Sequence, residues 1–111
     1  MFDIRHYTTE DARDPVQSWL DDLRDQEARH RISSRIGRLQ RGILGDSRAV
    51  GGAIRELRIH YGPGYRVYFA MMDKEVILLL CGGDKKTQRA DIALAQKRLR
   101  DWKSKHRETK P

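Results

Sequence analysis

The chain begins with a strand pattern followed by two helical patterns of apolar residues. Phe2 and Ile4 alternate with polar neighbours, which is typical of a short strand with one face on a core. Apolar residues then recur every three or four positions within residues 16–23 and again within 28–43, and this spacing predicts two helices. Because only a short turn separates them, we expect an antiparallel helical hairpin.

The ends of both predicted helices carry local signals. Asp14 can cap the first helix, and Pro15 fits its first turn because a proline there removes an amide that would have no helical partner. The second helix should follow a turn near Asp25 and end around Gly42, since glycine is favoured where helices terminate.

The second half of the chain predicts three further strands. Residues 44–52 have turn chemistry and no sustained period, so we expect a loop there. Alternating apolar and polar positions over 56–61 and 65–72 predict two strands, joined by a turn at residues 62–64. The unbroken apolar run 76–80 suits a strand that is covered on both faces.

A terminal helix completes the predicted domain, since apolar residues between 92 and 102 are spaced by three and four. The expected fold is α+β, in the order βααβββα, with helices packed on a small, mostly antiparallel four-stranded sheet. We expect one domain over residues 1–103, because 111 residues are about the size of one core. Residues 104–111 should form a basic, flexible tail.

The net charge of the chain indicates which classes of partner it can attract. Lys and Arg number 23 against 16 Asp and Glu, and the net charge of +7 predicts attraction to nucleic acid, an acidic protein or an anionic membrane. The membrane is the weakest of these, because the longest apolar run, 76–81, is far below the roughly 20 residues that span a bilayer. Cys81 is the single cysteine, which excludes an internal disulfide and a cysteine-rich zinc cluster. We expect it to be buried. We also expect the protein to belong to the reducing cytoplasm.

Two neighbouring predicted strands carry chemistry. Arg58 and His60 alternate on the first, and Arg66 and Tyr68 alternate on the second. If the turn closes a hairpin with these faces aligned, a phenol, an imidazole and two guanidinium groups share one surface. Arginine stays cationic and presents several donors, which suits charge on phosphoryl oxygens. The alternative, that these are ordinary solvated residues of an exposed strand, stays open.

The segment after the last strand is a second candidate for anion binding. Gly82 and Gly83 could let the backbone approach a ligand, while Lys85 and Lys86 enter at the start of a helix. An ordinary strand-to-helix turn capped by Asp84 explains the same residues equally well.

Three arginines and two tryptophans follow the helical patterns. Arg31, Arg35 and Arg38 form a basic stripe on the second predicted helix, and most stripes of this kind are solvated faces. Trp19 and Trp102 lie within apolar stripes, so we interpret them as core or partner contacts rather than as platforms for stacking bases.

Three motifs follow one another in the order of a known superfamily: Glu56-Leu57-Arg58, the strand sequence GYRVYF at 64–69, and LLLCGGDKKTQ at 78–88 with Asp91 after it. In these motifs the sequence resembles the RelE/ParE toxins, specifically the HigB-like, or phage Gp49-like, addiction-module killer proteins. The resemblance covers residues 1 to about 103 in element order. The GGDKKTQ string after a Gly-Tyr-Arg strand is its specific part.

The resemblance implies a function and partners. Toxins of this kind have a cognate antitoxin encoded alongside, which we expect to be acidic or DNA-binding, and the RelE and HigB branches cleave mRNA on the ribosome. No cofactor is implied, and we expect no metal because the sequence lacks a carboxylate cluster suited to two metal ions. Two alternatives stay open: a ParE-like inhibitor of DNA gyrase, and a nucleic-acid-binding or ribosome-binding module without catalysis.

Site residues are carried over position by position. RelE-type toxins also use a tyrosine in the C-terminal segment, where this chain has Asp91 and Ile92, so the general base is left open among His60, Tyr68 and Asp91. The expected catalytic residues are Arg66, Lys85, His60, Tyr68 and Asp91, the expected RNA-phosphate contacts are Arg58, Lys86 and Gln88, and the expected antitoxin contacts are Arg31, Arg35 and Arg38.

Overall fold

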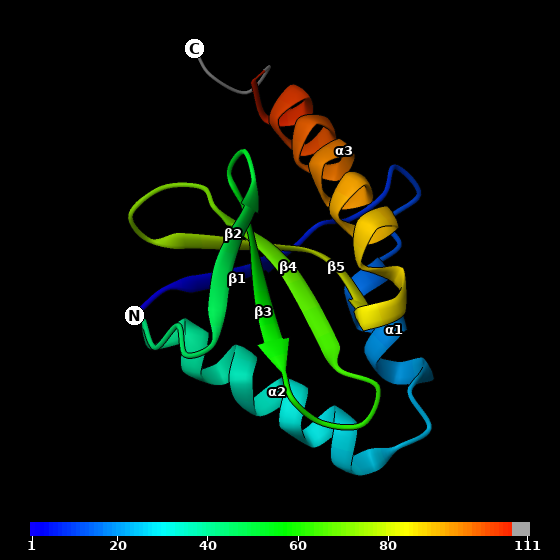
Figure 1. The fold of residues 1–111 in the computed structure, drawn as a ribbon. Coiled ribbons are helices and arrows are strands. Elements are labelled where there is room, and N and C mark those ends of the chain that lie inside the picture. Colours follow the sequence, from blue (N-terminus) through cyan, green and yellow to red (C-terminus); the bar gives the residue numbers. More distant parts are fainter. Residues whose placement is uncertain (108–111) are drawn as a thin grey trace.

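The computed structural model describes residues 1–107 and shows a mixed α+β fold built on one five-stranded sheet (Figure 1). The strands are β1 (Asp3–His6), β2 (Ser47–Gly51), β3 (Ile54–Ile59), β4 (Tyr65–Met71) and β5 (Val76–Asp84). The helices are α1 (Pro15–Asp22), α2 (Gln26–Gln40), the short 3-10 helix η1 (Lys85–Thr87) and α3 (Gln88–Arg107).

The sheet has the strand order β1-β5-β4-β3-β2. β1 pairs with β5 in parallel, and the other neighbours are antiparallel. The prediction of four strands is wrong, because β2 lies within the expected loop 44–52 and pairs with β3. The strand has no apolar alternation over Ser47, Arg48 and Ala49, so hydrophobic patterning could not reveal it. It forms through backbone pairing with β3.

The helix starts form as expected. The Asp14 side chain accepts a hydrogen bond from the Gln17 amide at 3.0 Å, and Pro15 is the first residue of α1. Asp25 caps α2 by accepting from the Ala28 amide at 3.2 Å. α1 packs mainly against β5 and α2 against β3, so the expected helical hairpin is not the main contact of either helix.

The terminal helix is longer than the apolar pattern indicates. α3 continues beyond residue 103, the predicted end of the domain, as far as Arg107. The rest of the predicted tail, residues 108–111, lies outside the described residues.

Helices cover both faces of the sheet. α1 and α2 bury one face, where Val16 and Ile32 join Leu57 and Phe69 in one apolar cluster and Trp19 packs against it. A second cluster lies beneath α3 and includes Tyr68, Leu80, Ala95 and Leu99, with Trp102 against it. Both tryptophans are therefore core contacts, as expected. α3 packs mainly on β5 and β4 and leaves the β2–β3 side of its face open, where the candidate site lies.

Candidate functional site

A cavity of about 690 Å³ opens on the part of the sheet that α3 leaves uncovered. Its lining residues are Arg48, Arg58, His60, Tyr61, Gly62, Pro63, Gly64, Arg66, Lys85 and Gln88. Four of them are arginine or lysine, one is histidine, and none of these described lining residues is acidic. We call this hollow the cationic cavity. Its charge suits an anionic ligand.

The register of β3 and β4 brings the predicted residues onto one face. Arg58 pairs with Arg66 and Glu56 pairs with Tyr68 across the two antiparallel strands. Directly paired residues point to the same side of a sheet, so the aligned hairpin expected from the alternation is confirmed. His60 follows the last residue of β3 and lines the same cavity.

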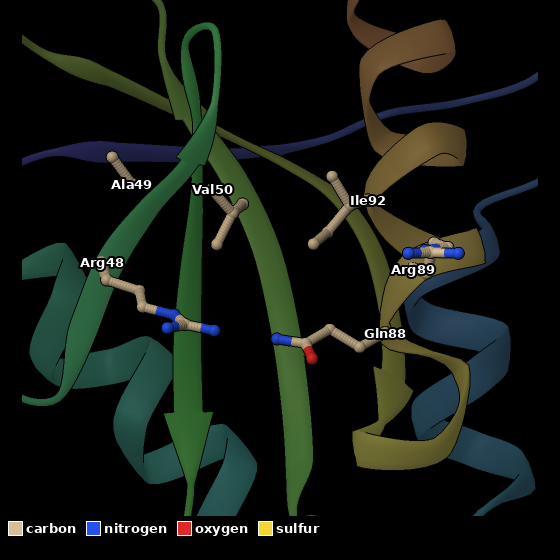
Figure 2. Close-up of a pocket in the computed structure, with 6 residues that line it drawn as sticks. All are labelled: Arg48, Ala49, Val50, Gln88, Arg89 and Ile92. Atoms are coloured by element: carbon tan, nitrogen blue, oxygen red, sulfur yellow. The ribbon is translucent and has the colours of Figure 1, made fainter.

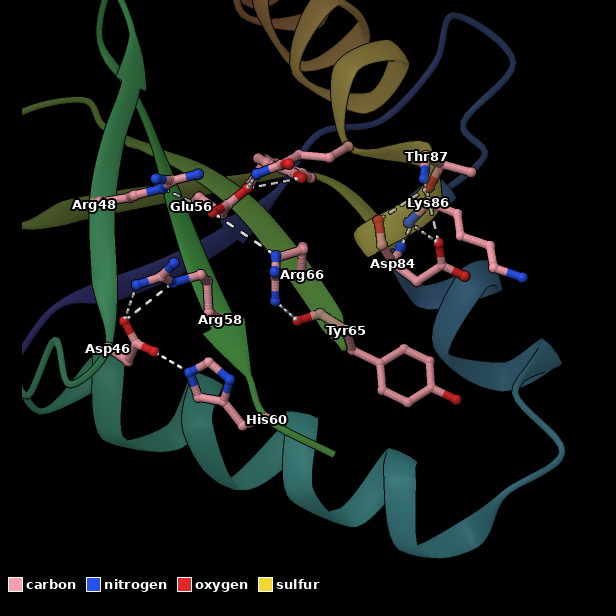
Figure 3. A network of polar contacts seen from close by, with 12 residues as sticks. Asp46, Arg48, Glu56, Arg58, His60, Tyr65, Arg66, Asp84, Lys86 and Thr87 are labelled. Atoms are coloured by element: carbon pink, nitrogen blue, oxygen red, sulfur yellow. Dashed lines mark hydrogen bonds and ion pairs between the residues drawn. The ribbon is translucent and has the colours of Figure 1, made fainter. Parts of the chain in front are cut away.

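Glu56 is the centre of a polar network beneath this cavity (Figure 3). Its side chain is fully buried, and Oε1 lies 3.2 Å from Arg48 Nε and 3.8 Å from Arg66 Nε. Oε2 accepts hydrogen bonds from the Tyr68 hydroxyl at 3.1 Å and from Gln88 Nε2 at 2.6 Å. A buried carboxylate requires such partners. Glu56 belongs to one of the three sequence motifs but was not among the predicted site residues, although its place opposite Tyr68 in the predicted hairpin was the available signal.

Arg66 lies beside Glu56 with much of its hydrogen-bonding capacity unused. The residue is only 7% exposed, and its buried Nε has no hydrogen-bond partner among the described residues. The one hydrogen bond that it donates within residues 1–107 is a long one of 3.5 Å, from Nη1 to the Tyr65 carbonyl. A buried guanidinium with unused donors is the kind of group that an anion satisfies. Arg66 therefore fits its predicted place in an anion site.

Asp46 joins Arg58 and His60 at the side of the cavity. Its Oδ1 accepts from Arg58 Nη2 at 2.9 Å and from Nε at 3.2 Å, while Oδ2 contacts Nε2 of His60. The hydrogen bond from His60, followed by that from Arg58, lowers the pKa of Asp46. The His60 side chain is 68% exposed, and among the described residues its Nδ1 has no partner. Asp46 was missed because it lies in the segment predicted to be a loop.

The other two candidates for the general base lie elsewhere. Tyr68 is fully buried, and its pKa is raised mainly by burial and then by Glu56. Asp91 accepts a hydrogen bond from Thr87 Oγ1 at 2.6 Å and does not line the cationic cavity. Of the three candidates, the structure brings only His60 to the cavity.

The segment after β5 is both a capped turn and part of the site. Asp84 caps η1 by accepting from the Lys86 amide at 2.9 Å and the Thr87 amide at 3.3 Å. Lys85 is exposed and lines the cationic cavity, whereas the exposed Lys86 does not. Gln88 reaches the cavity from the first position of α3.

Gly82 and Gly83 serve packing rather than the approach of a ligand. A Cβ at Gly82 would overlap the ring of Trp19, which packs from α1. A Cβ at Gly83 would overlap the carboxylate of Asp91 on the other face. The expectation that these glycines admit a ligand is therefore wrong, because protein side chains fill both spaces.

The predicted arginine stripe on α2 divides into structural and exposed members. Arg35 is half-buried and donates to the Arg58 carbonyl at 2.7 Å, and burial lowers its pKa. Arg31 is exposed, pairs with Glu27 at 3.1 Å and lies over the Tyr61 ring. Arg38 is also exposed. Only Arg31 and Arg38 are placed to meet a partner.

The structure gives less support to a reactive cysteine, a metal site or a membrane span among the described residues. Cys81 is buried as expected, and burial raises the pKa of its thiol to about 12. Within residues 1–107, no group of three or more His, Cys, Asp or Glu side chains is placed to hold a metal ion. In the same part of the chain, no helix has the length and apolar character needed to cross a membrane.

Comparison with known proteins places the site within a family. The chain matches the family described as phage derived protein Gp49-like (DUF891) over residues 18–100, a range that includes every residue lining the cationic cavity. It is also 48% identical over 79 residues to an uncharacterized protein of Haemophilus influenzae, and this match covers 71% of the chain and 80% of that protein. The chain therefore belongs to the Gp49-like family of phage-derived proteins.

Proposed function

We propose that this chain is the toxin of a type II toxin–antitoxin module and that it cleaves mRNA on the ribosome without a metal ion. The observation that carries the proposal is the cationic cavity, in which the Nε of the buried Arg66 donates no hydrogen bond to any of the described residues. Membership of the Gp49-like family supports it, because the sequence motifs of this chain resemble HigB-like toxins.

Metal-free cleavage of RNA needs few groups. The ribose 2′-oxygen attacks the adjacent phosphorus, the bond to the 5′-oxygen breaks, and the products are a 2′,3′-cyclic phosphate and a 5′-hydroxyl. A base removes the 2′ proton, an acid protonates the leaving oxygen, and cations stabilise the charge on the phosphorane.

We assign these roles to residues that line the cationic cavity. Arg66 and Lys85 contact the non-bridging phosphate oxygens, and Arg58 contacts a neighbouring phosphate. His60 removes the 2′ proton through Nδ1, because its Nε2 is held by Asp46. Lys85 protonates the leaving 5′-oxygen.

Two of the remaining predicted residues, Tyr68 and Asp91, support these groups without touching RNA. The Tyr68 hydroxyl donates a hydrogen bond to Glu56, which lies between Arg48 and Arg66. We therefore interpret Tyr68 as a positioning residue. Asp91 accepts a hydrogen bond from Thr87, the last residue of η1, and Lys86 contacts phosphates outside the cavity. The open cavity presents a single imidazole, so alignment of the 2′-oxygen with phosphorus falls to the ribosome.

Primer extension on ribosomes programmed with mRNA tests the proposal. The wild-type protein should create new 5′ ends within codons, and Lys85→Ala and His60→Ala should reduce the cleavage rate by roughly 10²-fold or more. Lys74→Ala is the matched control, because Lys74 is exposed in the turn between β4 and β5 and does not line the cavity. It should cleave like the wild type.

Other outcomes would replace the proposal. Inhibition of gyrase supercoiling without new 5′ ends would identify a gyrase inhibitor. Ribosome binding that leaves the mRNA intact would identify a non-catalytic module.

A further inference from the structure

A second cavity adjoins the first between β2 and the start of α3 (Figure 2). It has a volume of about 470 Å³ and is lined by Arg48, Ala49, Val50, Gln88, Arg89 and Ile92. Arg48 and Gln88 line both cavities, so a ligand can pass from one to the other without leaving the surface. The volume lies within the range of about 300–1,000 Å³ that small-molecule sites occupy.

The two sides of this cavity differ in chemistry. Val50 and Ile92 are partly buried and point toward one another from β2 and α3, which gives the cavity apolar walls. Below them, Arg48 and Gln88 point toward one another, and both contact the buried Glu56. A ligand that fits therefore has a flat apolar face and a polar edge, as a nucleobase does.

Glu56 also fixes the orientation of the Gln88 amide. Carboxylate oxygens accept hydrogen bonds, so the Gln88 group 2.6 Å from Glu56 Oε2 is the NH₂ donor. The Gln88 carbonyl oxygen is then turned away from the carboxylate and has no hydrogen-bond partner among the described residues. This oxygen can accept a hydrogen bond from a ligand and cannot donate one.

We propose that the second cavity binds one unpaired nucleobase of the RNA strand whose phosphate occupies the cationic cavity, and that Gln88 selects bases with an exocyclic amino group. Adenine, cytosine and guanine carry such a donor, and uracil does not. Carbonyl oxygens flank the one N–H of uracil and repel the Gln88 oxygen. The proposal rests on the proposed function for the identity of the ligand as RNA, and it adds a position of base preference.

Binding can be measured without ribosomes. The probes are hexanucleotides of 2′-deoxyuridine that contain a single deoxyadenosine or deoxycytidine, which the 2′-oxygen mechanism cannot cleave. In fluorescence anisotropy we expect the wild-type protein to bind them about three- to tenfold more tightly than the all-uracil probe, the effect of one hydrogen bond. Gln88→Leu should bring the ratio to about one. Gln40→Leu, on the exposed end of α2, should leave it unchanged.

A second measurement uses the unaltered protein, since Gln88→Leu also removes a partner of Glu56. In methyl NMR spectra of the wild type, the deoxyadenosine probe should shift the signals of Val50 and Ile92. Equal affinity for all probes, or unshifted Val50 and Ile92 signals, would overturn the base site.

The two proposals fail in different ways. Base-selective binding by a protein that leaves mRNA on ribosomes intact would remove the nuclease function and keep the base site. Cleavage of mRNA by a protein that binds all probes equally would remove the base site alone.

Discussion

Gln88 Nε2 lies 2.6 Å from Glu56 Oε2, so the first residue of α3 is tied directly to the middle of β3. The same carboxylate contacts Arg48 of β2 and Arg66 of β4. One buried acidic residue therefore links three strands and a helix around the cationic cavity. The groups that we assign to phosphate binding depend on it for their position.

Glu56→Ala should lower the free energy of unfolding by about 3–5 kcal/mol, because it leaves the buried Arg66 guanidinium without its counter-charge. Urea unfolding followed by circular dichroism measures the change. Glu75→Ala is the control: Glu75 is exposed next to β5, and its removal should change the free energy of unfolding by no more than about 0.5 kcal/mol. Equal effects of the two substitutions would show that the Glu56 network does not hold the fold.

Gly82→Ala and Gly37→Ala should change stability in opposite directions. A methyl group at Gly82 overlaps the Trp19 ring, and overpacking of this kind costs about 1–3 kcal/mol. Gly37 lies within α2, and a Cβ there meets nothing within 4 Å, so alanine should stabilise the protein by about 0.5–1 kcal/mol. Thermal unfolding of both variants checks the pair, and a stable Gly82→Ala protein would mean that Trp19 can move aside at little cost.

Asp46 should contribute stability that disappears in acid. Hydrogen bonds from His60 and Arg58 lower its pKa in the folded protein below the ordinary value of 3.8. The stabilisation is therefore fully present above pH 3.8 and is lost as the pH falls through the lower pKa that Asp46 has in the folded protein. Asp46→Asn should be less stable than the wild type at neutral pH. In urea titrations, the difference in free energy of unfolding between the two proteins should vanish well below pH 3.8. A difference independent of pH would assign the effect to packing.

Hydrophobic patterning predicted those elements whose burial follows a simple period. The spacing in α1 and α2 identified them because one face of each helix meets the core. Alternation identified β4 although both of its faces are buried, with Val67 and Phe69 in one apolar cluster and Tyr68 and Ala70 in the other. β2 escaped prediction because Ser47, Arg48 and Ala49 place no apolar face inward, so the strand exists through its pairing with β3. Pairing of this kind leaves no periodic signal in a single sequence.

The sequence predicted which site residues share one face of the sheet, but it did not predict which of them are buried and which are exposed. Alternation placed Arg58, Arg66 and Tyr68 on one side of a hairpin, as observed. It could not show that α3 covers Tyr68 and leaves Arg58 open, because this depends on where a distant helix crosses the sheet. Glu56 was missed for the same reason, since its partners come from β2, β4 and α3.

We expect the antitoxin to be acidic and to bind the exposed arginines of α2. Arg35 is excluded from this surface, since it donates to the Arg58 carbonyl at 2.7 Å and its reversal would disturb the fold. The double variant Arg31→Glu, Arg38→Glu should slow association with the antitoxin by about tenfold and weaken its salt dependence.

The control for this double variant carries the same change of charge on another helix. Lys97 and Arg100 are exposed on α3, so Lys97→Glu, Arg100→Glu alters the net charge equally without touching α2. Stopped-flow association at several salt concentrations separates the two effects. A loss confined to the α2 variant locates the docking surface, because overall charge is matched. Equal losses in both variants would reduce the role of α2 to long-range attraction, and unchanged rates in the α2 variant would place the antitoxin elsewhere.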